Sequence, residues 1–107
     1  MKYLLLFHGG EIPEDKIAKS VEDRLAWMNM LRDKGNFIDG SPLLPDGKEI
    51  GENGVNNFVH ESNSVNGYAI IQAEDIDRAV ELSRLAPQIK SKYGSATIEI
   101  RPLQPIG

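Results

Sequence analysis

Polar residues that could do chemistry are few in this chain and come from separate segments. His8 ends an apolar run and precedes Gly9 and Gly10. At such a place an imidazole can stand at the mouth of a cavity while the backbone approaches a ligand closely. His8 is therefore a candidate for proton transfer or ligand binding. The simpler interpretation is a polar residue that merely ends a strand.

Asp39 is the second candidate, because it lies inside an otherwise apolar stretch and directly before Gly40. A carboxylate is costly there unless it is hydrogen-bonded or paired, so Asp39 could serve as a perturbed general acid or base. A turn-stabilising aspartate that accepts from the backbone two residues further on explains the same position. His8 and Asp39 together form the catalytic pair of the enzymatic hypothesis.

Glu99 and Arg101 share one face of an alternating segment in which Ile98 and Ile100 point the other way. The guanidinium of Arg101 could bind a carboxylate ligand through two hydrogen bonds, with Glu99 orienting it. Alternatively, the two residues form an interfacial ion pair that sets the register of a dimer. His60, next to a polar tract, is a further ligand-binding candidate, and we expect it to be exposed.

Composition removes several classes of function. The 12 Lys and Arg against 16 Asp and Glu give a net charge of -4, so nucleic acid and anionic membranes are not expected partners. The absence of cysteine excludes a thiolate nucleophile, a disulfide frame and a cysteine zinc site. No metal or cofactor is expected from the remaining motifs. The apolar run at residues 3–7 is too short for a signal peptide or a membrane span, so we expect a cytoplasmic protein.

The elements that must position these residues follow from hydrophobic periodicity. Residues 2–7, which are continuously apolar from residue 3 onward, are typical of a central strand. A helix of about twenty residues is predicted to begin near Pro13 and to end at Gly35. Its apolar stripe is predicted to consist of Ile17, Val21, Leu25, Met28 and Leu31. Trp27 lies beside this stripe, where core packing is the default expectation.

The middle third of the chain is predicted to be an edge strand followed by a hairpin. Pro42 limits residues 36–43 to an edge or a bend. Turn signals at residues 45–47 and at Asn53 and Gly54 then predict a short hairpin. Its second strand is predicted to begin at residue 55, and residues 61–66 to form a polar loop.

The last third predicts a strand, a helix and a strand. Residues 68–73 are predicted to form a strand, and Asp75 is a good N-cap for the helix that follows. Pro87 should stop or kink this helix, and residues 96–101 alternate as a strand. The buried face of the helix is predicted to be Ile76, Ala79, Val80 and Ser83, with Leu82 flanking.

This order of elements predicts a single α+β domain over residues 1–107. It is the split βαβ pattern of a ferredoxin-like sheet, with both helices on one face and a hairpin insertion. We expect the first strand and the last two strands to lie in the interior of the sheet. Because residues 3–7 and 68–71 are apolar on both faces, the uncovered face should meet a second copy of the chain. The sequence therefore predicts a homodimer through the sheet face.

The chain also resembles YCII-related proteins of the DGPF type over almost its whole length. The resemblance rests on the opening strand (residues 1–10), the first helix (27–35), the second strand (37–43) and the C-terminal segments 67–71 and 94–103, with Asp75, Asp77 and Ala79. It implies a ferredoxin-like protomer that pairs into a dimeric α/β barrel.

One stretch departs from this family. Where the family carries Asp-Gly-Pro-Phe, this chain has Val55-Asn56-Asn57-Phe58, so only the phenylalanine is kept. The resemblance also implies a site formed by a His and Asp pair, for which Asp39 is the matching position here. The first helix has no histidine, so the partner would have to be His8 or His60.

Two hypotheses about function follow. The chain is expected to be a homodimeric module that binds a small molecule, such as an organic acid, or another protein. The alternative is a cofactor-independent enzyme of the lactone hydrolysis, isomerisation or dehalogenation type, in which His8 and Asp39 transfer protons.

Overall fold

The architecture is a helix-covered antiparallel sheet with a separate hairpin. The computed structural model describes residues 1–58, 64–90 and 96–106. In chain order the elements are β1 (Lys2–His8), η1 (Glu14–Lys16), α1 (Ile17–Asp33), β2 (Phe37–Pro42), β3 (Gly47–Gly51), β4 (Gly54–Phe58), β5 (Val65–Gln72), α2 (Ile76–Arg84), η2 (Pro87–Ile89) and β6 (Thr97–Pro102).

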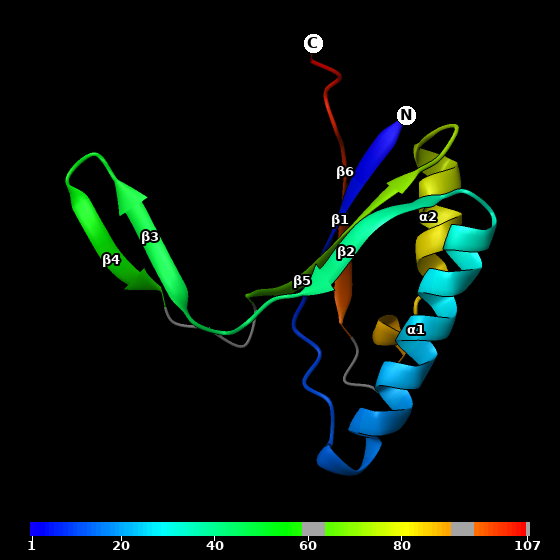
Figure 1. The fold of residues 1–107 in the computed structure, drawn as a ribbon, viewed down its shortest axis with the longest axis horizontal. Helices are drawn as coiled ribbons and strands as arrows, with labels where there is room; N and C mark the ends of the chain where they lie inside the picture. Colours follow the sequence, from blue (N-terminus) through cyan, green and yellow to red (C-terminus); the bar gives the residue numbers. More distant parts are fainter. Residues whose placement is uncertain (59–63, 91–95, 107) are drawn as a thin grey trace.

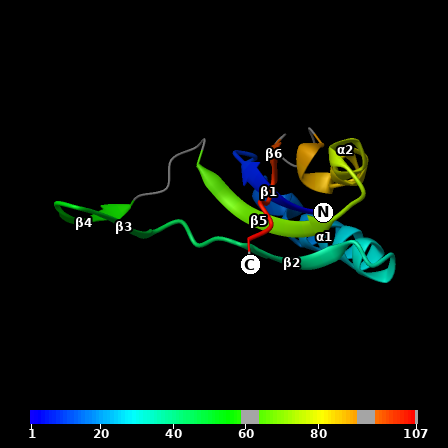
Figure 2. The ribbon, with the colours of Figure 1, turned by 90° about the horizontal axis from the view of Figure 1, so that it is seen from above.

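The main sheet has the strand order β2-β5-β1-β6, and all neighbouring strands are antiparallel. This is the ferredoxin-like order predicted from the sequence, and both helices lie on one side of the sheet (Figures 1 and 2). The prediction of three interior strands was wrong for β6. Only β1 and β5 are central, because in this split pattern the last strand pairs with the first alone and closes the sheet as an edge.

Alternation along β1 sends every second side chain into the core. Tyr3, Leu5 and Phe7 are buried on the side of the helices, where Ala69 and Ile71 of β5 are buried as well. From the edge strand β6, the partly buried Ile98 and Ile100 pack against the same cluster. The helix-facing side of the sheet is therefore the core of the protomer.

The side of α1 that faces the core differs from the predicted stripe. Ser20, Trp27 and Leu31 are its buried residues, whereas Ile17, Val21 and Leu25 are 40–52% exposed. Trp27 takes the central place because its ring packs edge-on to Phe7, with centroids 6.2 Å apart. Its Nε1–H also donates to the carbonyl of Leu82 in α2 at 3.0 Å. The large aromatic surface and its polar atom outweigh the more regular aliphatic spacing.

Gly35 ends α1 as predicted. Its φ of 77° is left-handed, and it lies directly after the C-cap residue Lys34. The amides of Gly35 and Asn36 donate to the carbonyls of Arg32 and Leu31, at 3.0 and 2.8 Å. These two bonds satisfy carbonyls that the helix end would leave unpaired, in the manner of a Schellman motif.

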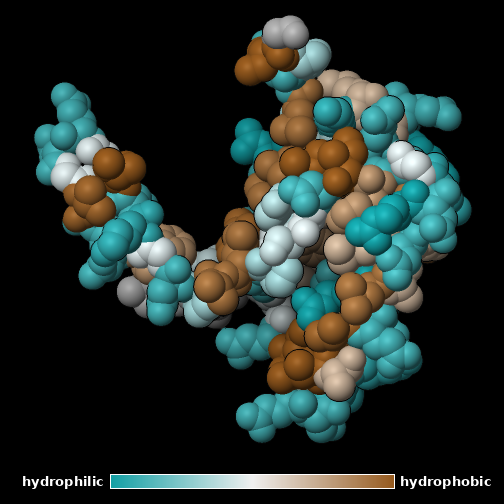
Figure 3. All heavy atoms as spheres, viewed as in Figure 1, coloured by the Kyte–Doolittle hydropathy of each residue, from teal (hydrophilic) through white to brown (hydrophobic). Residues whose placement is uncertain are grey.

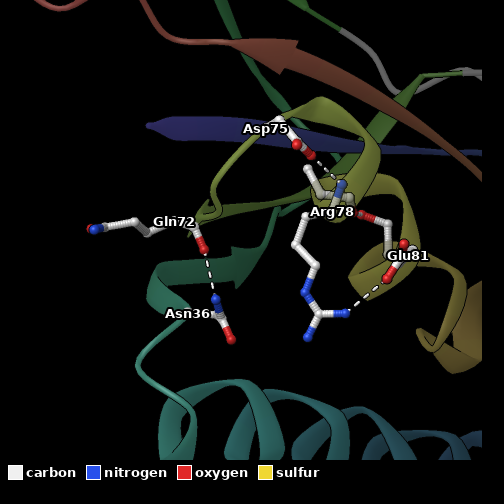
Figure 4. Close-up of polar contacts among 7 residues, drawn as sticks. Asn36, Gln72, Asp75, Arg78 and Glu81 are labelled. Atoms are coloured by element: carbon white, nitrogen blue, oxygen red, sulfur yellow. Dashed lines mark hydrogen bonds and ion pairs between the residues drawn. The ribbon is translucent and has the colours of Figure 1, made fainter.

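Asp75 caps α2 as predicted, because its carboxylate accepts from the amide of Arg78 at 2.9 Å (Figure 4). The predicted buried face was rotated. Ala79, Leu82 and Ser83 are the buried residues, and Ile76 is 44% exposed. The helix is only nine residues long and leans on the sheet near its C-terminal half, so Leu82 rather than Ile76 reaches the core.

The predicted hairpin is present and stands apart from the sheet. Strands β3 and β4 pair only with each other in the described part of the chain, and each of their residues is exposed. We call residues 43–58 the arm. It leaves the body from the end of β2 on the side of the sheet opposite the helices (Figures 1 and 2). The altered Val55 to Phe58 stretch lies in this arm, in β4.

Candidate functional site

The surface of the sheet that the helices leave uncovered, here called the helix-free face, has an apolar centre and polar margins. Its residues are Leu4, Leu6 and His8 of β1, Tyr68 and Ile70 of β5, Asp39 and Ser41 of β2, and Thr97, Glu99 and Arg101 of β6. The leucines and Ile70 are half-buried in the single protomer. The side chains of the candidate residues thus share one face of the sheet.

His8 meets Glu99 on this face. Its Nε2 lies 2.9 Å from Oε1 of Glu99, and because a carboxylate only accepts, Nε2 carries the proton in this bond. The other carboxylate oxygen of Glu99 lies 3.7 Å from Nη1 of Arg101. Both side chains of the His8 pair are partly exposed, at 30% and 42%. The three residues form one polar row that could bind an anion or pair with another chain.

Asp39 is not part of this row. Asp39 pairs with Ile70 of β5, and Ile70 pairs with Leu4 of β1. Asp39 therefore lies two strands away from His8 across the sheet and four residues away along the strand direction. Strand spacings of about 4.8 Å and a rise of about 3.3 Å per residue put their Cα atoms about 16 Å apart. Arg101 is level with Asp39 but three strands away. The structure therefore brings His8, Glu99 and Arg101 together and leaves Asp39 apart.

Asp39 instead pairs with Tyr68, whose hydroxyl donates to Oδ2 at 2.9 Å. This hydrogen bond, with the negative charge of Asp39, raises the pKa of the Tyr68 hydroxyl above its ordinary value. The folded state thus holds the Tyr68 proton to a higher pH than the unfolded state does. Its contribution to stability is complete below the ordinary tyrosine pKa and is lost as the pH rises through the folded pKa.

We expect the Asp39→Asn variant to lower the pKa of Tyr68 towards its ordinary value, because the acceptor's charge is removed. Tyrosinate absorbance during an alkaline titration measures this. The chain has three tyrosines, so a Tyr68→Phe variant identifies the step that belongs to Tyr68. An identical titration of the Asp39→Asn variant and the unchanged protein would contradict the observed bond.

A cavity of about 270 Å³ lies on the other side of the sheet, between α1 and the β2–β5 edge. Its floor is formed by residues with little or no side chain, Gly40, Gly67 and Ala69, and its apolar walls include Leu25 and Met28 of α1. The short residues leave the space open, since no side chain rises from these positions to meet the helix. The volume is near the lower end of the range typical of small-molecule sites.

Two polar groups in this cavity lack partners. Nε of Arg24 and Oε1 of Gln88 are both buried, and neither has a hydrogen-bond partner within the described residues. Arg24 comes from α1, and Gln88 comes from η2, which packs against α1. A buried unpaired group costs about 1–3 kcal/mol, and a charged one costs more. The cavity therefore presents an unmatched donor on a permanent cation and an unmatched acceptor.

Sequence reasoning missed both Arg24 and Gln88. A signal for Arg24 was present, because it lies three residues after Val21 and four before Met28, on the apolar side of α1. A cation at such a position needs an explanation. Gln88 carries no comparable signal, because it follows Pro87 in a segment without periodicity. His8, Asp39, Glu99 and Arg101 are not among the residues that line the cavity. His60 lies outside the described residues.

The described part of the chain contains neither a metal site nor a membrane-spanning helix. In residues 1–58, 64–90 and 96–106, no cluster of three or more His, Asp or Glu side chains could hold a metal ion. Neither helix in those ranges is long and apolar enough to cross a membrane.

The chain is similar to known proteins both in sequence profile and in fold. Residues 1–105 match the sequence profile of the family described as YCII-related domain. The solved structure of 5-chloro-2-hydroxyhydroquinone dehydrochlorinase (TftG) from Burkholderia phenoliruptrix AC1100, in complex with 2,5-dihydroxybenzoquinone, is similar with a TM-score of 0.55. The alignment covers 97% of this chain and 94% of that chain at 14% identity, so the likeness concerns the fold. No curated protein sequence matches this one.

Proposed function

Because this chain belongs to the family of YCII-related domains, which matches it over residues 1–105, we propose that it is a homodimeric module that binds a small organic acid. The ligand site is the cavity under α1, and the helix-free face pairs two protomers. The observation that carries the proposal is the cavity of about 270 Å³ that is lined by Arg24, whose buried Nε lacks a hydrogen-bond partner among the described residues.

The chemistry of the cavity defines the class of ligand. Its apolar walls suit a ring or a short hydrocarbon body, and Nε–H of Arg24 offers a charge-assisted hydrogen bond to an anionic oxygen. The carboxamide oxygen of Gln88 needs a donor, which a hydroxyl group on the ligand supplies. A hydroxylated organic acid meets all three requirements. The 2,5-dihydroxybenzoquinone in the similar TftG structure, a small ring with hydroxyl and carbonyl oxygens, supports a ligand of this kind.

The homodimer explains the helix-free face. Its half-buried apolar centre, Leu4, Leu6 and Ile70, is bordered by charged and hydroxyl side chains, which is the usual arrangement of a protein interface. In the dimer the His8, Glu99 and Arg101 row then fixes the register of the two sheets. The cavity under α1 lies on the opposite side of the sheet and stays accessible.

The alternative is a cofactor-independent enzyme of the lactone hydrolysis, isomerisation or dehalogenation type. It would use His8 and Asp39 for proton transfer, with Glu99, Arg101 or His60 binding the substrate. The TftG neighbour is a dehydrochlorinase, which favours this class. Against it stands the separation of Asp39 from His8 by two strands and four residues, because two groups acting on one substrate must lie within its reach.

Thermal-shift measurements with benzoate, salicylate and neutral benzyl alcohol test the proposal. We expect the two acids to raise the melting temperature, salicylate more than benzoate because its hydroxyl can meet Gln88, and benzyl alcohol to have little effect. In the Arg24→Gln variant, loss of the charge-assisted bond should weaken binding about 10- to 100-fold. Lys19→Gln removes an exposed cation from the same helix and should leave binding unchanged.

The same titrations separate the two hypotheses. His8→Gln and Asp39→Asn should keep full binding, because neither residue lines the cavity. Loss of binding in both, with Arg24→Gln unaffected, would favour the enzymatic alternative. Equal binding of the acids by Arg24→Gln and the unchanged protein would refute the cavity as their site.

A further inference from the structure

The arm is an unusual feature for a protein of this size, because it exposes apolar side chains without a core of its own. Leu44 is 89% exposed, Ile50 79%, Val55 57% and Phe58 44%. Ile50 and Val55 are cross-strand partners on one side of the hairpin, and Figure 3 shows hydrophobic surface near the tip of the arm. An isolated two-stranded hairpin is at best marginally stable in water, so the arm needs a surface to pack against.

The direction of the arm identifies that surface. In both views it projects from the body on the side of the helix-free face, away from α1 and α2 (Figures 1 and 2). A second sheet stacked on that face would lie about 10 Å away. The five-residue strands of the hairpin extend for about 17 Å, so the arm is long enough to pass the edge of the stacked sheet.

The size of the helix-free face points to the same conclusion. A four-stranded face with these strand lengths measures about 20 by 20 Å, or about 400 Å² in projection. Each partner in a stable interface contributes roughly 800 Å². The face is thus small for a stable interface, and the exposed apolar side chains of the arm can add contact area to it.

From these observations we propose that the arm clasps the second copy of the chain, with Ile50 and Val55 packed against the partner protomer. The inference rests on the homodimer proposed above. In a two-fold dimer the contact is made twice, because each arm reaches the other protomer. The arm thereby converts a small sheet-to-sheet contact into a stable interface.

The test measures the dimer dissociation constant by sedimentation over a concentration series. The double variant Ile50→Ser and Val55→Ser should raise this constant at least about tenfold, because two apolar contacts per arm are lost. The matched control is Glu49→Ser with Asn56→Ser, a cross-strand pair on the opposite side of the same hairpin. The control should leave the constant within about twofold of the unchanged protein.

A second measurement guards against simple unfolding of the hairpin. The chain has no cysteine, so an Ile50→Cys variant carries a single thiol. Its reaction with a thiol reagent should slow at protein concentrations above the dissociation constant, and a Glu49→Cys thiol should remain reactive.

The outcomes distinguish the two levels of the proposal. A protein that sediments as a monomer at all concentrations overturns both the homodimer and the clasp. A dimer whose dissociation constant is unchanged by the Ile50 and Val55 substitutions, or whose Ile50→Cys thiol reacts equally fast at all concentrations, overturns the clasp alone. A control pair that weakens the dimer as much as the apolar pair also overturns it.

Discussion

Replacing Trp27 with alanine is expected to lower the free energy of unfolding by about 3–5 kcal/mol. Trp27 is 5% exposed and connects both helices to the sheet, because it packs edge-on to Phe7 and donates to the carbonyl of Leu82. The alanine variant removes this contact area and the hydrogen bond to the Leu82 carbonyl, and it leaves a cavity. A domain of ordinary stability has about 5–15 kcal/mol in total, so this loss is a large part of the free energy of unfolding.

Chemical denaturation followed by far-ultraviolet circular dichroism measures this loss. Tryptophan fluorescence cannot be used, because the variant lacks the only tryptophan of the chain. All variants are compared at one protein concentration, because a dimer's apparent stability depends on it. Leu25→Ala, two residues earlier on the same helix and 52% exposed, is the matched control and should cost about 1 kcal/mol or less. A Trp27→Ala loss no larger than that of the control would contradict the central place of Trp27.

The second large effect is expected from Leu6→Asp on the helix-free face. Leu6 lies between Tyr68 and Glu99 in neighbouring strands and is half-buried in the single protomer. In the proposed dimer it becomes fully buried, where an unpaired carboxylate costs several kcal/mol. We expect the dimer dissociation constant to rise about 100-fold or more while the protomer stays folded.

Sedimentation velocity at micromolar concentration detects the change from dimer to monomer, and circular dichroism shows whether the fold is retained. Leu85→Asp places the same charge at the end of α2, at a position that is 54% exposed and belongs to the helical layer. This control should remain dimeric. A Leu6→Asp protein that dissociates no more than the control would refute pairing through the helix-free face.

Local signals in the sequence predicted the elements well, because each signal acts over a few residues. Asp75 accepts from the amide three residues on, and Gly35 supplies the left-handed residue that a helix end needs. The turn residues around Asn53 and Gly54 predicted the hairpin for the same reason. The order of these elements was then sufficient to predict the ferredoxin-like sheet.

Predictions about which side of a helix is buried were less accurate. Of the aliphatic stripe predicted for α1, Leu31 is buried, but Trp27 and Ser20 are the other buried residues of the helix. Periodicity locates an apolar side only to within a broad sector, and the packing of one large side chain decides the rotation within that sector. Val21 and Leu25, two exposed members of the predicted stripe, line the cavity under α1.

What the sequence determined by itself was local: the strands and helices, their caps and turns, and the shared face of Glu99 and Arg101. A strand's period of two fixes the face of a side chain but not its neighbour across the sheet. The tertiary structure decided that His8 contacts Glu99, that Asp39 pairs with Tyr68, and that Arg24 lines a cavity with its buried Nε unpaired among the described residues. Strand order and register determine which side chains come into contact, and both arise from contacts between segments that are distant in the chain.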